Sequence, residues 1–281
     1  MRFNHSSEFL QVNRQLFSLR EGIVMGILNV TPDSFYAPSR VTVQIIADRA
    51  GQMLQEGAHI LDVGGYSTRP NASDVPLSEE LERVLVAVET IVKYFPNACI
   101  SVDTFRSHVA EKAIQAGAHI INDVSGGQAD PQMFACVGRL KVPYVLMHSR
   151  GNPQTMQSLT NYTHLIEEIM VFFQNRIHKL IQHGCCDIII DVGFGFAKTL
   201  EQNYLVLNQL EKFKIFELPI LVGISRKSMI WKLLKSSPDD ALNGTSALHL
   251  WALSRGANIL RVHDVKPAIE ILQIYRALQT Y

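Results

Sequence analysis

The sequence predicts an α/β fold, a (β/α)8 TIM barrel, on three observations. Short apolar runs rich in Ile, Leu and Val alternate with amphipathic segments of helical periodicity, eight times along the chain. A glycine recurs between the end of a helical segment and the start of the next run. The chain has 281 residues, of which 47% are hydrophobic, and this suits one large domain with a buried core. We therefore expect a single domain over residues 1–281, with the barrel core at about 22–280.

The recurring glycines mark where helices end and strands begin. Gly57, Gly117 and Gly256 each precede an alanine and a short apolar run, and Gly184 precedes a similar run. Glycine directly after a helix is typical of a C′ cap, where a positive φ costs it little. An apolar run of this kind is typical of a strand that is buried on both faces.

The expected elements follow from these patterns. Strands are expected near residues 23–29, 59–64, 99–103, 119–123, 143–148, 187–192, 220–224 and 258–263. Helices are expected near residues 42–56, 78–95, 107–117, 131–139, 161–183, 201–211, 228–236, 240–255 and 266–279. Asp130 and Pro131 are expected as the N-cap and first residue of the fourth helix. An open doubly wound sheet is the alternative, but no Gly-x-Gly-x-x-Gly motif opens a helix after the first strand.

Charge and cysteine usage limit the partners and the compartment. The formal net charge is zero and no basic block occurs, so we expect no nucleic-acid partner. Residues 1–10 lack an apolar signal core, and no apolar run approaches the roughly 20 residues that cross a bilayer. The cysteines lack metal-ligand spacing, and Cys185 and Cys186 are adjacent, which predicts reduced thiols. We therefore expect a cytoplasmic protein with no membrane partner.

In this class of barrel the active site lies at the carboxyl ends of the strands. The polar residues at these ends include Asn29, Asp62, Asp103, Asn122, His148, Asp191, Lys227, Arg261 and His263. A polar residue after a strand is often only a turn former or helix cap, and this alternative stays open for Asp33, Asp123 and Asp264. The number of cationic side chains beside these carboxylates exceeds what capping requires and indicates a ligand site.

The strand ends divide into two chemistries. One set surrounds a cation with acceptors and amides, and consists of Asp62, Asp103, Asn122, Asp191 and Lys227. Because a carboxylate accepts two parallel N–H bonds, this set suits a flat polar heterocycle with an amidine-like edge. The second set is rich in donors, suits a phosphate or pyrophosphate, and consists of Asn29, Arg69, Arg261 and His263. Residues 225–228 lead into a helix whose N-terminal amides can hold a further anion.

Taken in order, these residues resemble the motifs of the dihydropteroate synthase family. The resemblance begins at residues 25–35, which read Met-Gly-Ile-Leu-Asn-Val-Thr-Pro-Asp-Ser-Phe, and at residues 62–65, which read Asp-Val-Gly-Gly. It continues through residues 67–70, 101–104, 121–124, 147–153, 193–196, 223–228 and 261–265. It spans roughly residues 22–276. One such motif is weak evidence, whereas all of them in order are specific.

The resemblance implies a reaction, a cofactor and an assembly. In that family 6-hydroxymethyl-7,8-dihydropterin pyrophosphate condenses with p-aminobenzoate to give 7,8-dihydropteroate and pyrophosphate. This is a step of folate biosynthesis, and sulfonamides compete there with p-aminobenzoate. The resemblance also implies Mg²⁺, held through Asn29 together with phosphate oxygens and waters. The partners it implies are the two small-molecule substrates and a second copy of the chain, in a homodimer formed through the late helices.

The resemblance assigns roles to individual residues. The pterin pocket is expected to contain Asp103, Asn122, Met147, Asp191 and Lys227. The pyrophosphate site is expected to contain Asn29, Arg69, Arg261 and His263. The p-aminobenzoate surroundings are expected to contain Thr68, Arg69, Pro70, Phe196 and Ser228. The catalytic residues are expected to be Asp103, Lys227 and Asp33. Two alternatives stay open, in which Met147 only fills the core and Gly193 and Gly195 only serve a turn.

The charges of these groups indicate a mechanism. As pyrophosphate leaves with the bonding electrons, positive charge develops on the pterin methylene carbon and spreads into the ring, where Asp103 and Asp33 can stabilise it. Mg²⁺, Arg261 and His263 stabilise the leaving anion. The arylamine is neutral at pH 7 and attacks directly, so the reaction needs no covalent enzyme nucleophile and no strong general base.

The loop after Asn29 departs from the family pattern. Residues 33–39 read Asp-Ser-Phe-Tyr-Ala-Pro-Ser, where the family usually continues Ser-Phe with Ser-Asp-Gly-Gly. Tyr36 and Pro38 are expected to stiffen this loop, which predicts a raised KM for p-aminobenzoate with pterin binding largely intact. Three further departures are Tyr66 in place of Glu, Val192 in place of Pro and Ala197 in place of Gly.

Two other functions are compatible with parts of the pattern. The methyltetrahydrofolate-binding module of corrinoid methyltransferases shares the fold and a similar pocket of Asp and Asn. Such a module has no need of Arg69, Lys227 or the neighbouring Arg261 and His263. A non-catalytic homologue is supported only by the altered first loop, and it predicts pterin binding without pyrophosphate release.

Overall fold

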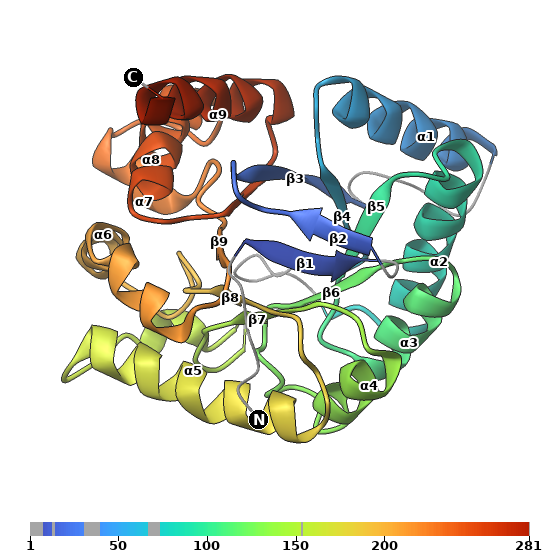
Figure 1. Cartoon of the computed structure of the whole chain (residues 1–281), viewed down its shortest axis with the longest axis horizontal. Helices are drawn as coiled ribbons and strands as arrows, with labels where there is room; N and C mark the ends of the chain where they lie inside the picture. The colour runs from blue at the N-terminus through green and yellow to red at the C-terminus, as the bar shows by residue number, and fades with distance from the viewer. Residues whose placement is uncertain (1–7, 13–14, 31–39, 67–73, 153, 281) are drawn as a thin grey trace.

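Eight parallel strands close into a barrel in the order β10-β3-β4-β5-β6-β7-β8-β9, and helices surround them (Figure 1). The structure is a computed structural model, and it describes residues 8–12, 15–30, 40–66, 74–152 and 154–280. Each barrel strand is followed by a helix, and every such helix except the last leads to the next parallel strand. The predicted (β/α)8 TIM barrel is therefore confirmed.

Every expected element is present, with ends displaced by a few residues. The barrel strands are β3 (Ile23–Asn29), β4 (Ile60–Gly64), β5 (Cys99–Asp103), β6 (Ile120–Asp123), β7 (Tyr144–Met147), β8 (Ile188–Asp191), β9 (Ile220–Val222) and β10 (Ile259–Val262). The helices are α1 (Arg40–Gln55), α2 (Leu77–Tyr94), α3 (Ser107–Gln115), α4 (Met133–Leu140), α5 (Leu165–Gln182), α6 (Leu200–Asn208), α7 (Ser228–Leu233), α8 (Leu242–Ser254) and α9 (Val265–Thr280). Short 3-10 helices are η1 (Met156–Ser158), η2 (Leu210–Phe216) and η3 (Asp239–Ala241). In the part of the chain that the structure describes, none of the helices combines the length and apolarity that a membrane span requires.

The prediction that Asp130 and Pro131 begin the fourth helix is wrong. That helix, α4, begins at Met133, and Pro131 lies in the turn before it. The Asp130 carboxylate accepts the backbone N–H of Gln132 at 2.9 Å and that of Ser107 at 2.7 Å. Ser107 is the first residue of α3, so Asp130 satisfies an amide at the start of the neighbouring helix instead.

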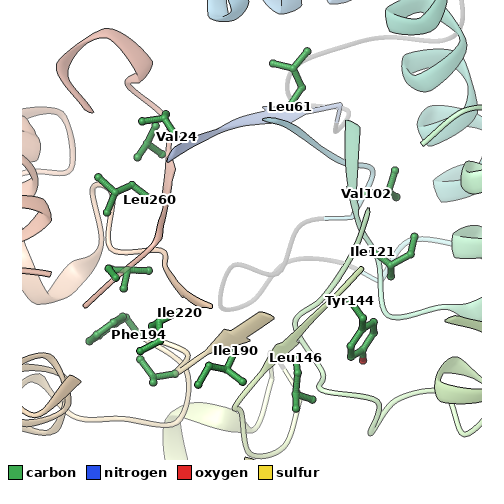
Figure 2. Packing of buried hydrophobic residues seen from close by; sticks show 14 of the residues in the cluster. Val24, Leu61, Val102, Ile121, Tyr144, Leu146, Ile190, Phe194, Ile220 and Leu260 are labelled. Atoms are coloured by element: carbon green, nitrogen blue, oxygen red, sulfur yellow. The ribbon is translucent and has the colours of Figure 1, made fainter. Parts of the chain in front are cut away.

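The outward faces of the barrel strands supply much of the hydrophobic core. Figure 2 shows these side chains directed from the ring of strands toward the helices, among them Val24, Leu61, Val102, Ile121, Tyr144, Ile190, Ile220 and Leu260. Val84, Val88 and Ile91 of α2 are fully buried in the same cluster. Full burial of such a side chain contributes about 1.5–3 kcal/mol. Because helices cover one face of each strand and the barrel interior covers the other, the strands read as continuous apolar runs.

A hairpin that was not predicted closes one end of the barrel. Its strands are β1 (Phe9–Val12) and β2 (Gln15–Ser18), which pair antiparallel, and Figure 1 shows them across the barrel. Leu10, Val12 and Leu19 are buried in one cluster with inward-facing residues near the strand starts: Ile23, Met25, Ile60, Cys99, Ile120, Val145, Ile189, Leu221 and Ile259. The amino-terminal end of the barrel is therefore filled with apolar side chains, and the polar residues lie at the opposite end.

The recurring glycines adopt the predicted conformation. The backbone angle φ is 101° at Gly57, 112° at Gly117, 85° at Gly184 and 99° at Gly256. All four values lie in the left-handed region, which glycine occupies at little cost. The predicted C′ caps are therefore confirmed, and each turns the chain from a helix into the next strand.

A polar residue two positions after three of these glycines joins adjacent strands. Its side chain accepts a backbone N–H from the start of the neighbouring strand. Nδ1 of His59 accepts from Val24 at 3.2 Å, and Nδ1 of His119 accepts from Ile100 at 3.2 Å. Oδ1 of Asn258 accepts from Ile220 at 3.0 Å. Each of the three also donates its own backbone N–H to that neighbouring strand. The repeated sequence pattern therefore encodes both the cap and the first interstrand contact.

Candidate active site

A ring of charged and amide side chains lies inside the carboxyl end of the barrel. Nε of Arg261 donates to Oδ2 of Asp62 at 2.6 Å, and Nη2 of Arg261 donates to Oδ2 of Asp103 at 2.7 Å. Asn122 donates its Nδ2 to the same Oδ2 of Asp62 at 3.0 Å. One guanidinium thus joins two carboxylates, from β4 and β5, to β10 on the other side of β3.

Burial determines how the groups of this ring ionise. Burial raises the pKa of Asp103 to about 7, although the adjacent Arg261 acts in the opposite direction. Burial disfavours the charged form of Arg261, but Asp62 and Asp103 outweigh this and hold its pKa above its ordinary value. Asp103 therefore changes charge near neutral pH, whereas Arg261 stays cationic.

The carboxyl end of β8 adds another carboxylate, and the loop after β9 adds a lysine. Oδ1 of Asp191 accepts the backbone N–H of Gly193 at 2.8 Å. Burial raises the pKa of Asp191 and lowers that of Lys227 to about 8, while each charge opposes the shift of the other. Nζ of Lys227 donates to the carbonyl oxygen of Phe194 and lies 4.7 Å from the ring centroid of Phe196. Lys227 therefore connects the loop after β9 with the loop after β8.

The loop after β9 is held by Arg226. Its Nε and Nη2 donate to both carboxylate oxygens of Asp264, at 2.7 and 2.9 Å, and Nη1 donates to the carbonyl oxygens of Pro238 and Asp239. The backbone of Arg226 has a φ of 54°, which is unusual for a residue other than glycine. Most of its donors are used within the protein. Asp264 is therefore an ion-pair partner of Arg226, a role that neither the ligand site nor the turn or cap alternative predicted.

The predicted pyrophosphate residues that the structure describes lie on neighbouring strands. β10 pairs with β3, which places Arg261 and His263 beside the strand that ends at Asn29. The backbone N–H of His263 donates to Oγ of Ser225 at 3.1 Å, and Nδ1 of His263 lies 3.1 Å from the same oxygen. Asn29 pairs with Gly64 of β4, where a Cβ atom would stand 3.4 Å from Oδ1 of Asn29.

The structure brings the predicted pterin residues together at one end of the barrel. Asp103, Asn122, Met147 and Asp191 are buried at the ends of four consecutive strands, and Lys227 follows the next. Phe196 lies on the loop after β8, and Ser228 is the first residue of α7. Asp33, Thr68, Arg69 and Pro70 lie outside the described residues, as does the altered first loop at residues 33–39.

Two groups at the strand ends serve turns. The carboxylate of Asp123 accepts the backbone N–H of Ser125 at 2.7 Å and that of Gly127 at 2.9 Å, so the turn alternative describes Asp123. Gly193 has a φ of 70°, and a Cβ atom there would stand 2.0 Å from the carbonyl oxygen of His148. The turn after Asp191 therefore requires glycine at position 193.

A cavity of about 590 Å³ lies beside the charged ring, between the loops that follow β4 to β8. Its lining includes Tyr66, Phe105, Gln128, Asn152 and Phe196. Tyr66, which replaces the usual Glu, donates its hydroxyl to Oδ1 of Asp74 at 3.0 Å and makes this wall aromatic. Asp62, Asp103 and Arg261 of the ring do not line this cavity.

Comparison with known proteins assigns the chain to a family. The model of the family described as pterin binding enzyme matches residues 25–263. The chain belongs to this family. It is 44% identical over 274 residues to a dihydropteroate synthase of Synechocystis sp., with 96% of this chain and 94% of the relative covered. It is 43% identical over 257 residues to a dihydropteroate synthase of Escherichia coli, with 90% of each chain covered.

Solved structures agree with the sequence matches. The dihydropteroate synthase of Yersinia pestis, in complex with a sulfonamide drug, superposes with a TM-score of 0.90 at 38% identity, over 97% of this chain and 100% of the other. That of Xanthomonas albilineans with 4-aminobenzoic acid superposes with a TM-score of 0.90 at 37% identity, over 98% and 100%. The function predicted from the sequence, dihydropteroate synthase, and the transferase class are confirmed.

Three features of the site were not assigned a role from the sequence. Asp62 was placed in the charged ring but left out of the pterin pocket, although the structure puts it at the centre of the ring. Its position near the end of β4, the strand beside β5, was the available signal. The pairing of Arg226 with Asp264, and the burial of Lys198 beside His148, join residues far apart in sequence, and no spacing rule links them.

Proposed function

We propose that this chain joins 6-hydroxymethyl-7,8-dihydropterin pyrophosphate to p-aminobenzoate, with release of 7,8-dihydropteroate and pyrophosphate. The observation that carries the proposal is the buried group of Asp62, Asp103 and Asn122 around Arg261. A phosphate ligand alone has no use for two carboxylates at this depth. A pterin ring presents N–H donors along its edge, and buried carboxylates and amides are their natural partners.

The pterin pocket is proposed to contain the predicted residues and, in addition, Asp62. Among the described residues, Oδ1 of Asp62 has no hydrogen-bond partner although it is fully buried, so it is an acceptor open to a ligand or a water. Asp103 and Asn122 stand on the next two strands of the barrel. Met147 is buried at the end of β7, where its thioether suits contact with a flat ring.

The pyrophosphate is proposed to bind between β3 and β10, through Asn29, Arg261 and His263 with Arg69. Guanidinium groups bind phosphates through parallel hydrogen bonds, which favours arginine at such a site. Arg261 is bonded to two carboxylates in the structure, and pyrophosphate is an anion that competes for the same donors. Arg261 is therefore proposed to contact both substrate regions and to couple their occupancy.

Asn29 is proposed to hold Mg²⁺. This ion usually takes one or two protein ligands and completes its coordination with phosphate oxygens and waters. Asn29 offers an amide oxygen at the end of β3, where Gly64 leaves space beside it. One neutral oxygen donor fits an ion that arrives with pyrophosphate, and when bound the ion would neutralise charge on the leaving group.

The p-aminobenzoate is proposed to lie against Phe196 and Ser228, with Thr68, Arg69 and Pro70. Lys227 touches the loop that carries Phe196 and directly precedes Ser228, so it links this region to the pterin residues. The cavity of about 590 Å³ shares Phe196 and extends the space for an aromatic substrate away from the charged ring.

The proposed chemistry is displacement of pyrophosphate by an amine. The carbon–oxygen bond breaks and its electrons leave with pyrophosphate, whose charge Arg261 and His263 stabilise. Ionised Asp103, together with Asp33, stabilises the positive charge that develops on the pterin. The lone pair of the arylamine then forms the carbon–nitrogen bond, and the amine releases its extra proton to solvent or to the leaving group.

The assembly is proposed to be a homodimer of single-domain subunits in the cytoplasm. Leu205 of α6, Leu233 and Leu234 at the end of α7 and Trp251 of α8 are exposed apolar residues on adjacent helices. A groove between α6 and α8 is lined in part by Leu205 and Trp251. An apolar surface of this kind suits a second copy of the chain. All four cysteines are free thiols, which agrees with a reducing compartment.

A single assay tests the proposed function. Purified protein is mixed with the pterin pyrophosphate, p-aminobenzoate and Mg²⁺, and dihydropteroate and pyrophosphate are measured together. Equal amounts of the two products are expected, and none when p-aminobenzoate is omitted. Binding of the pterin substrate with no release of pyrophosphate in the complete mixture would show a non-catalytic homologue instead.

A further inference from the structure

Lys198, which has no assigned role, is a buried lysine whose Nζ is surrounded by neutral acceptors. Its Nζ donates to the carbonyl oxygens of Gly193 at 2.9 Å and Phe196 at 3.1 Å, and lies 3.1 Å from Nδ1 of His148. Among the described residues no carboxylate forms an ion pair with it. Burying an ammonium group without a paired carboxylate is costly, so stability alone gives little reason for lysine at this position.

Burial lowers the pKa of Lys198 to about 7, although the nearby Asp191 acts in the opposite direction. Burial lowers the pKa of His148 well below its ordinary value, and the nearby Lys198 acts in the same direction. His148 is therefore neutral, and its Nδ1 can accept a hydrogen bond from the ammonium group. The three acceptors together satisfy the three N–H donors of Lys198.

The loop that Lys198 holds has an unusual backbone. Three of its residues have positive φ, namely Gly193 at 70°, Gly195 at 79° and Ala197 at 47°. A left-handed conformation is unfavourable for alanine, the residue at position 197. Such a loop depends on side chains outside it to keep its shape, and Lys198 bonds to carbonyl groups near both of its ends.

Two other side chains contact the same loop from its outer side. Oδ1 of Asn203 accepts the backbone N–H of Gly195 at 2.7 Å, and the hydroxyl of Tyr162 donates to the carbonyl oxygen of Ala197 at 3.0 Å. Lys198 differs from both because it bonds to the carbonyl group of Phe196 itself. The ring of Phe196 lines the cavity beside the active site.

We propose that Lys198 is a positioning residue for the arylamine site, which holds Phe196 in place through the carbonyl oxygens of Gly193 and Phe196. The proposal rests on the proposed assignment of Phe196 to p-aminobenzoate. It also accounts for a buried lysine that, in the part of the chain that the structure describes, forms no ion pair with a carboxylate. Asp191 and Lys227 also contact this loop, at Gly193 and Phe194, but they stand on β8 and on the loop after β9. Since Lys198 bonds the carbonyl group of Phe196 itself, its effect is expected to fall mainly on the arylamine.

The experiment compares Lys198→Met with the unaltered enzyme in steady-state kinetics. Methionine keeps the length of the buried stem and removes all three donors. The KM for p-aminobenzoate is expected to rise roughly tenfold, the size of effect that loss of one well-placed aromatic contact produces. The KM for the pterin pyrophosphate is expected to change by less than about threefold, and Lys198→Gln, which keeps neutral N–H donors, should restore part of the loss.

Two further variants make the result decisive. Tyr162→Phe removes one hydrogen bond from the same loop without touching Phe196, and its KM for p-aminobenzoate should stay within about twofold. Phe196→Ala tests the assignment on which the proposal rests. If Phe196→Ala raises the KM for p-aminobenzoate and neither Lys198 variant does, the positioning role is wrong while the proposed function stands. If Phe196→Ala leaves that KM unchanged, the arylamine assignment itself fails.

If Lys198→Met does not fold, the KM for p-aminobenzoate is measured for Lys198→Gln and Lys198→Arg instead. Thermal melting of each variant is recorded beside the kinetics. A lowered melting temperature with an unchanged KM for p-aminobenzoate in the folded enzyme would show that Lys198 serves stability only. A raised KM for p-aminobenzoate at temperatures where the variant is fully folded supports the positioning role.

Discussion

Two opposing influences act on the ionisation of Asp103. Burial favours its neutral form, and Arg261 favours its charged form. Asp103 is buried beside Arg261, and burial raises its pKa to about 7. The proposed reaction needs this carboxylate in its ionised form, as acceptor for the pterin and as stabiliser of positive charge. The fraction of enzyme that is competent therefore depends on pH near neutrality.

This leads to a prediction for Asp103. The kcat/KM for the pterin substrate should rise with pH through about 7, as Asp103 loses its proton, and fall again above about 8, as Lys227 loses its own. Asp103→Asn should lower kcat by roughly a hundredfold and remove the acidic limb of the profile. Measurement of kcat and kcat/KM from pH 5.5 to 9.5 checks both effects. Near-normal turnover of Asp103→Asn would contradict the charge-stabilising role.

His59 and His119 show how single residues make stability depend on pH. Burial lowers the pKa of both, with Arg276 adding to the effect at His59. Each must be neutral at Nδ1 to accept the N–H of the neighbouring strand. Since the folded protein resists protonation of these residues and the unfolded chain does not, stability is present above the ordinary histidine pKa of about 6.5 and is lost as the pH falls below it.

The third member of this repeat supplies the matching variant. Asn258 makes the same contact through an amide oxygen, which does not titrate in this range. His59→Asn and His119→Asn should therefore change the free energy of unfolding by less than about 1 kcal/mol at pH 7.5 and weaken its decline toward pH 5. Urea denaturation at several pH values measures this. Asn258→His should have the reverse effect, and an unaltered pH dependence in all three variants would refute the explanation.

At the scale of elements, the carboxyl ends of β9 and β10 are tied together by Arg226 and Asp264. This pair lies between residues of the proposed pyrophosphate site and of the proposed p-aminobenzoate site. Ser225 bonds to His263 of the first site, and Lys227 directly precedes Ser228 of the second. The ion pair is bidentate and only partly exposed, which makes it stronger than an ordinary surface pair.

A double-mutant cycle tests this connection. Arg226→Ala, Asp264→Ala and the double variant should each lower kcat/KM by roughly tenfold, because removing either partner already frees the loop. The pair Arg255 and Glu211, at the opposite end of the barrel, is the matched control, and its removal should leave the kinetics unchanged. Additive losses at Arg226 and Asp264 would mean that the two residues act independently.

The hairpin of β1 and β2 shows what an element-level pattern can miss. Its strands have four residues each, and only alternate side chains face the barrel. The sequence of this segment therefore mixes polar and apolar residues and lacks the continuous apolar run of a barrel strand. Leu10 and Leu19 are nevertheless almost completely buried. The hairpin is recognisable only as the partner of an open barrel end, and that end exists only once the barrel has closed.

At the scale of the whole molecule, the proposed dimer has a specific test. Trp251 of α8 is 42% exposed and Leu234 after α7 is 55% exposed, on the side of the barrel opposite α2 (Figure 1). Trp251→Glu places a charge in the proposed interface and should convert a dimer into a monomer. Light scattering after size-exclusion chromatography measures the mass. Tyr94→Glu, at the end of α2, is the control, and a protein that is monomeric before any substitution would exclude the dimer.

Much of the site was predictable from the sequence because a parallel barrel brings all its strand ends to one rim. Once eight apolar runs were recognised, Asp103, Asn122, Asp191 and Arg261 had to meet there. The turn roles of Asp123 and Gly193 were predicted as alternatives and were seen. The predicted N-cap at Asp130 failed, since local sequence shows that an amide will be satisfied but not which helix supplies it.

The sequence by itself determined the barrel, its strand ends and the types of charge at its mouth, because apolar periodicity and glycine caps are local properties. Only the tertiary structure decided which charges pair. Asp62 and Arg261 stand almost two hundred residues apart in sequence and meet because β3 alone separates their strands. Lys198 and His148 likewise meet from two different loops. Such pairs depend on distances of about 3 Å between side chains, set by strand register, closure of the barrel and burial together.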